Sequence, residues 1–82
     1  MIYMWLYVFY LGDEKGANTD ILKIDMGVMD RLRKDIEDGK PILKINPGES
    51  MYEEKKGKLT LITYTQYIVM SNVCKIIIDD MN

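Results

Sequence analysis

The sequence predicts a single α+β domain, residues 1–82, in which one amphipathic helix covers one face of a small antiparallel or mixed sheet of four to five strands. Two observations indicate this class. Five segments are rich in β-branched and aromatic residues, and only one segment has apolar residues at helical spacing. The predicted helix is 26–38, and the predicted strands are 2–10, 21–24, 42–45, 59–70 and 73–78. An alternative arrangement is the same sheet curled into a small barrel.

The first predicted strand, 2–10, is an uninterrupted apolar run that ends at Gly12 and Asp13. As a helix, the run before Gly12 would be about 16 Å long, roughly half the hydrocarbon thickness of a bilayer. It also lacks the basic start of a secretory signal. A polar loop follows, and 21–24 is a short second strand. We therefore expect a cytoplasmic protein with no membrane segment.

The predicted helix has signals at both ends. The Asp25 carboxylate can accept hydrogen bonds from the free N–H groups of the first turn. Gly39 suits the left-handed position after the last turn, and Pro41 cannot continue a helix. Apolar residues at spacings of three and four predict the buried face: Val28, Met29, Leu32 and Ile36.

Two segments of the second half leave alternatives open. Residues 46–58 are polar and contain two glycines, so they form either an open loop or a hairpin in which 51–54 pairs with the chain from Leu59 onward. Residues 67–74 form either a strand and turn or a short helix. Their β-branched and aromatic side chains favour the strand.

The composition excludes most catalytic machinery. The chain has no histidine, which removes Ser-His and Cys-His pairs and imidazole metal sites. Its one cysteine, Cys74, excludes a disulfide framework within the chain and thiolate zinc sites, and its apolar neighbours predict a buried thiol. Eleven basic against thirteen acidic residues give a formal charge of −2, which does not favour nucleic-acid binding. We expect a non-enzymatic protein without cofactor or metal.

Charged residues on the helix and at the C-terminus predict ordinary surface. Helical spacing favours two ion pairs: Asp30 with Lys34, and Arg31 with Asp35. Asp79 and Asp80 are adjacent, so on a strand they would point to opposite faces. We expect a frayed terminus there, not a cation site.

Alternation along the first strand separates two apolar faces. One face is aliphatic: Ile2, Met4, Leu6 and Val8. The other is aromatic: Tyr3, Trp5, Tyr7 and Phe9, half of the aromatic residues of the chain. Burial of four aromatic side chains is worth about 6 to 12 kcal/mol, similar to the whole stability of a small domain. One short helix covers only the aliphatic face, so the aromatic face needs another cover: a curled sheet, the 46–58 segment, a second copy or a partner.

These features predict a small interaction or regulatory protein that acts by protein–protein binding as a homo-oligomer, through Tyr3, Trp5, Tyr7 and Phe9. Compact single domains of phages and mobile elements often have these properties, so such an origin fits. The alternative is an oligomeric nucleotide-binding or sequestering protein. Its rings would stack on a base while Arg31, Arg33 or Lys34 donated to phosphate at a subunit boundary. Nucleic-acid binding is disfavoured because the first fourteen positions contain no basic residue.

Overall fold

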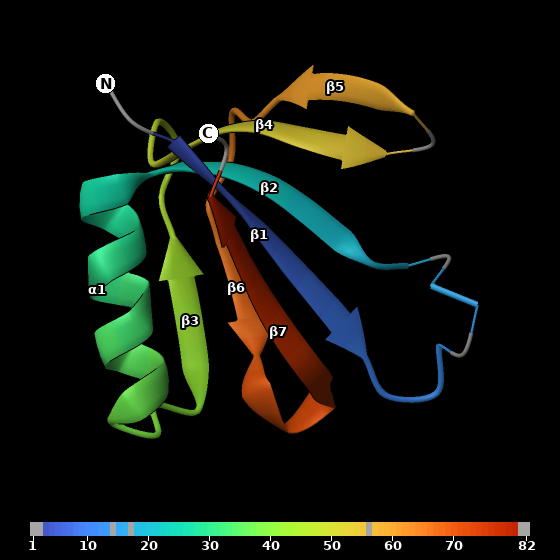
Figure 1. Cartoon of the computed structure of the whole chain (residues 1–82), viewed down its shortest axis with the longest axis vertical. Coiled ribbons are helices and arrows are strands. Elements are labelled where there is room, and N and C mark those ends of the chain that lie inside the picture. Colours follow the sequence, from blue (N-terminus) through green and yellow to red (C-terminus); the bar gives the residue numbers. More distant parts are fainter. Residues whose placement is uncertain (1–2, 14, 17, 56, 81–82) are drawn as a thin grey trace.

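The computed structural model describes residues 3–13, 15–16, 18–55 and 57–80, which form two antiparallel sheets and one α-helix (Figure 1). The five-stranded sheet has the order β5 (Lys58–Leu61), β4 (Ser50–Lys55), β2 (Asp20–Asp25), β1 (Tyr3–Tyr10) and β7 (Val73–Asp80). The two-stranded sheet pairs β3 (Ile42–Ile45) with β6 (Gln66–Val69). The α-helix, α1, spans Met26–Glu37, and a 3₁₀ turn, η1, spans Met70–Asn72.

The predicted α+β class with one helix is confirmed, but the predicted strands do not form one sheet. The strand expected at 59–70 is two strands, β5 and β6, which belong to different sheets. Between them Ile62 is buried at 4% exposure, because the chain turns there into the core. The barrel alternative is wrong: among the described strands, β5 and β7 remain separate edges of an open sheet.

Both segments for which the sequence left alternatives open, 46–58 and 67–74, contain strands. Residues 46–58 contain a hairpin, in which β4 pairs with β5 across a turn where Gly57 has a φ of 78°. Glycine adopts this left-handed conformation at little cost, because it has no Cβ. Residues 67–74 form a strand, the single turn η1 and the start of β7. The Met70 N–H donates to the carbonyl of Pro41 at 2.9 Å, which holds that turn beside the segment that precedes β3.

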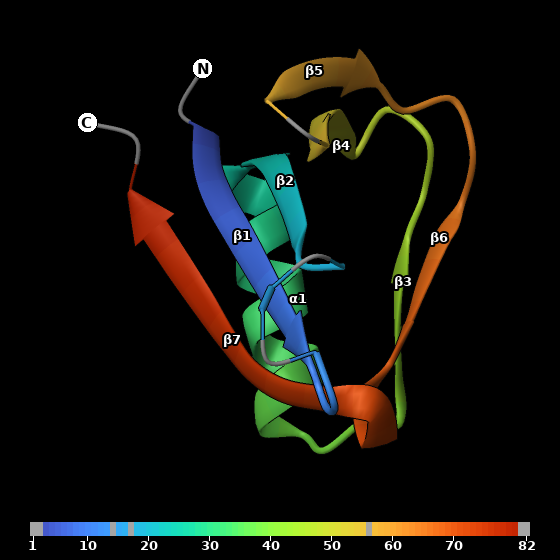
Figure 2. The same ribbon diagram turned by 90° about the vertical axis from the view of Figure 1, so that its right-hand side faces the viewer.

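The core lies between the two sheets and α1. In Figure 2, β3 and β6 stand apart from β1 and β7, and α1 lies behind β1. Side chains from every layer meet there: Leu6, Val8, Leu22, Ile24, Met29, Leu32, Leu43, Ile45, Ile62 and Ile68. The predicted helix face is confirmed, with Met29 and Leu32 fully buried and Val28 and Ile36 packed partly buried against them.

Both helix ends form as predicted. The Gly27 N–H donates to Asp25 Oδ2 at 3.0 Å, and Gly39 has a φ of 71°. The predicted ion pairs on the helix are wrong, because the charged side chains find other partners: Asp30 pairs with Arg33, Asp35 with Lys40 and Arg31 with Glu49. The C-terminus is not frayed at Asp79, since β7 runs to Asp80 in register with β1. None of the helices in the described segments could reach across a bilayer.

Replacing Asp25 with alanine is expected to lower the free energy of unfolding by about 1 kcal/mol, because the N–H of Gly27 loses its acceptor. Asp25→Asn retains an oxygen in the same place and is expected to keep most of the stability. Urea denaturation of both variants measures the difference. Equal losses in the two variants would contradict a capping role.

Candidate binding face on the five-stranded sheet

The register of the sheet places four aromatic rings on the face opposite the core. Tyr3, Trp5, Tyr7 and Phe9 alternate along β1 with the buried Leu6 and Val8. Residues directly across on the neighbouring strands share their face. We call this set the aromatic face: Tyr3, Trp5, Tyr7 and Phe9 of β1, Ile21, Lys23 and Asp25 of β2, and Lys75, Ile77 and Asp79 of β7.

The helix and the second sheet both pack on the other side. Buried side chains of α1, β3 and β6 join Leu6, Val8, Leu22 and Ile24 in one core. The hairpin β4–β5, one of the covers expected for the aromatic face, instead extends the same sheet beyond β2. The aromatic face therefore has neither the helix nor the second sheet over it, although its four aromatic residues are half-buried.

Lysine side chains from the adjacent strands account for part of that burial. Lys23 Nζ lies 4.9 Å from the centroid of the Tyr3 ring, and Lys75 Nζ lies 4.7 Å from the centroid of Phe9. An ammonium group over a ring is attracted to its π face, and the apolar stem shields the ring from water. Of these two lysines, Lys75 is exposed and Lys23 is half-buried.

A hollow of about 440 Å³ opens at the Phe9 end of the aromatic face. Its lining comes from the end of β1, the following loop and the start of β7: Phe9, Tyr10, Asp13, Lys15, Gly16, Cys74 and Lys75. The Asn18 N–H donates to Asp13 Oδ2 at 2.7 Å, which ties one side of the loop together. The lining carries two positive charges, Lys15 and Lys75, and one negative charge, Asp13, beside the ring of Phe9. The excess of one positive charge favours a carboxylate or another small anion over a cation.

Cys74 lines this hollow and is exposed, so the predicted burial of its thiol is wrong. The register explains the difference. Phe9 lies opposite Lys75 and Tyr10 lies opposite Val73, so Cys74 is the extra residue of a bulge and has no partner on β1. A bulge turns a side chain away from the regular alternation. A one-residue slip of this kind leaves no signal in the hydrophobic pattern.

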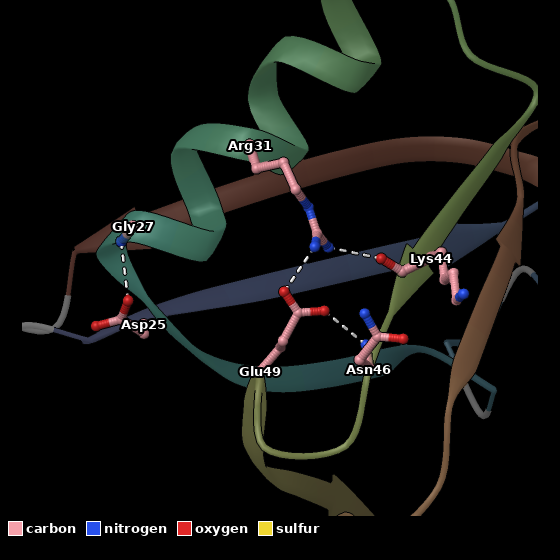
Figure 3. Close-up of polar contacts among 6 residues, drawn as sticks. All are labelled: Asp25, Gly27, Arg31, Lys44, Asn46 and Glu49. Carbon is pink, nitrogen blue, oxygen red and sulfur yellow. Dashed lines mark hydrogen bonds and ion pairs between the residues drawn. The ribbon is translucent and has the colours of Figure 1, made fainter.

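The basic residues of the helix lie elsewhere. Arg31 Nη1 donates to Glu49 Oε2 at 2.6 Å and Nη2 donates to the Lys44 carbonyl at 2.6 Å, while Glu49 Oε1 accepts from the Asn46 N–H at 2.8 Å (Figure 3). These bonds join α1 to the turn between β3 and β4. This ion pair leaves no local signal in the sequence, because eighteen positions separate Arg31 from Glu49.

Arg33 and Lys34 are exposed on α1, and Arg33 Nη2 lies 3.9 Å from the sulfur of Met4, a residue of the aliphatic face. The helix and the aromatic rings thus lie on opposite sides of the sheet. Within one chain, the structure therefore does not bring Arg31, Arg33 and Lys34 together with the rings of Tyr3 and Trp5.

Replacing Arg31 with methionine is expected to lower the free energy of unfolding by about 1 to 2 kcal/mol. Charge-assisted hydrogen bonds contribute roughly 1.5 to 3 kcal/mol when shielded, and partial exposure of both partners reduces that value. Chemical denaturation of Arg31→Met, Glu49→Gln and the double variant measures the coupling. Additive losses would show that the pair contributes nothing to stability.

The described residues contain no group of three or more acidic or thiol side chains arranged to hold a metal ion. Comparison of the chain with protein-family models, curated proteins and solved structures found no match. Within the described residues, the aromatic face and the hollow beside Phe9 form a candidate binding site.

Proposed function

We propose that the protein is a non-enzymatic binding module that docks a protein segment on the aromatic face, with an acidic side chain of the partner in the hollow beside Phe9. The row of four rings on the side of the sheet away from α1 carries this proposal. Tyrosine and tryptophan dominate binding energy in protein interfaces, because they bury a large apolar area with few rotatable bonds. We also propose a cytoplasmic location, because a free, exposed thiol such as that of Cys74 suits a reducing compartment.

The charges of the face favour a protein over a nucleic acid. Lys23 and Lys75 are balanced by Asp25 and Asp79, so the face lacks the net positive field that holds phosphates. Its centre is apolar, with Ile77 exposed at 43% beside Tyr7. An apolar centre with charges of both signs at the rim is the usual anatomy of a protein–protein interface.

Peptides selected from a random phage-displayed library on the immobilised protein test this proposal. We expect selected peptides to combine apolar residues with at least one Asp or Glu. Tyr7→Ser in the ring row and Lys15→Glu at the hollow should each weaken a selected peptide by about tenfold, since loss of one contact at an interface centre costs about 1 to 2 kcal/mol.

Arg33→Glu is the matched control, because it reverses an exposed charge on the helix side of the sheet. It should leave peptide affinity unchanged. The proposal would be refuted if selected peptides bound the Tyr7→Ser variant with the same affinity as the unaltered chain. It would also be refuted if Arg33→Glu lowered their affinity, since the binding site would then lie elsewhere.

A small anionic ligand such as a nucleotide is the second candidate, favoured by the hollow between Lys15 and Lys75 beside the Phe9 ring. This reading predicts a rise in melting temperature with ATP or GMP at millimolar concentration, since a ligand that binds only the folded state stabilises it. Lys15→Glu would abolish that rise and Tyr7→Ser would preserve it. The protein-binding proposal predicts no rise with either nucleotide.

A further inference from the structure

The strand β7 forms an open edge of the larger sheet. In the described chain only β1 pairs with it, and at eight residues it is twice as long as β5 at the opposite edge. Figure 2 shows β7 on the outside of the molecule, away from β3 and β6. A long edge strand presents backbone N–H and C=O groups that can pair with another chain.

The side chains of β7 divide between two faces. Lys75, Ile77 and Asp79 belong to the aromatic face, opposite Phe9, Tyr7 and Trp5. Ile76 and Ile78 lie opposite Val8 and Leu6 and pack partly buried against the core. A second copy of β7, running antiparallel, must align residues of the same face, since a slip by one residue would exchange core and surface side chains.

One register pairs residues of the same face and also places opposite charges across from each other. When Ile77 lies opposite Ile77 of a second copy, Lys75 lies opposite Asp79 and Ile76 lies opposite Ile78, and symmetry repeats both pairs. A shift by two residues places a charge opposite Ile77. A shift by four places Lys75 opposite Lys75 or Asp79 opposite Asp79, and like charges directly opposite are destabilising.

From this self-complementary pattern we propose that the protein forms a two-fold dimer by antiparallel pairing of β7 with β7 of a second copy, centred on Ile77. The dimer joins two five-stranded sheets into one and brings the two aromatic faces to the same side. It also covers Ile76 and Ile78, which a single chain leaves partly exposed. The dimer stands independently of the binding proposed for the aromatic face.

Disulfide trapping tests the register. The variant Cys74→Ser/Ile77→Cys places two thiols directly opposite across the two-fold axis, where Cβ atoms are about 4.5 to 5.5 Å apart and a disulfide can form with little adjustment. We expect a covalent dimer under mild oxidation. The unaltered chain is the matched control, because its exposed Cys74 would lie about 20 Å from its symmetry mate, six residues along the strand.

A second measurement does not depend on cysteine chemistry. Sedimentation velocity of the unaltered protein is expected to show twice the 9.6 kDa monomer mass at micromolar concentration. Asp79→Lys should raise the dissociation constant about tenfold at low salt by facing Lys75 with a second cation, and Lys75→Asp/Asp79→Lys should restore it. A monomer at all concentrations would overturn the proposal. Equal disulfide trapping through Cys74 and through position 77, or a charge exchange that fails to restore the dimer, would also overturn it.

Discussion

Replacing Leu6 with alanine is expected to lower the free energy of unfolding by about 3 to 4 kcal/mol. The Leu6 side chain has 0% exposure in the middle of β1, where it contacts a core built from both sheets and α1. Truncation of a fully buried leucine loses its transfer free energy and leaves a cavity. A domain of this size has a total stability of roughly 4 to 12 kcal/mol, so the loss is a large fraction of it. Urea denaturation followed by Trp5 fluorescence gives the value.

Tyr7→Ala is the control, because Tyr7 is the next residue of β1 and lies on the aromatic face. Its ring is half-buried, so we expect about half the loss seen for Leu6→Ala. A loss for Tyr7→Ala as large as that for Leu6→Ala would mean that the chain buries both faces of β1.

Leu43→Ala is the second substitution with a large expected effect, about 3 kcal/mol. Leu43 of β3 is fully buried and lies opposite the buried Ile68 of β6, so its truncation opens a cavity beneath the smaller sheet. Because that sheet shares its core with β1 and β2, the variant should unfold in one transition. Trp5 fluorescence, which reports on the larger sheet, and far-UV circular dichroism should give the same lowered midpoint.

Ile42→Ala provides the comparison for Leu43→Ala, because Ile42 precedes it on β3 and is exposed at 48%. It should cost less than about 1 kcal/mol. A Leu43→Ala chain in which Trp5 keeps the midpoint of the unaltered protein would contradict a shared core, since the two sheets would then unfold separately.

The elements that were predicted correctly carry their signals within a few residues. The strand β1 follows from an apolar run that ends at a Gly-Asp turn, and α1 follows from its spacing, the Asp25 cap and Gly39. The division of β1 into an aliphatic core face and an aromatic outer face is likewise local, because alternation needs only a strand.

The features that were missed depend on contacts between distant segments. In sequence, residues 59–70 have the composition of one strand. In the structure, the chain passes within this segment from the larger sheet to the smaller one, and Ile62 is buried in the core between them. The partner of Arg31 is Glu49 instead of Asp35, because β3 brings the following turn to the helix. The hollow depends on the Cys74 bulge and on the fold of the loop around Lys15. None of these arrangements follows from local propensity.

The openness of the aromatic face is tested most directly by collisional quenching of Trp5, the single tryptophan of the chain and a member of that face. With acrylamide as the quencher, we expect a quenching constant between the value for the urea-unfolded chain and the value for a fully buried tryptophan. Addition of a selected peptide should lower it. A quenching constant as low as that of a buried indole, measured on the protein alone, would show that the chain already covers the aromatic face and that the face is not open to a partner.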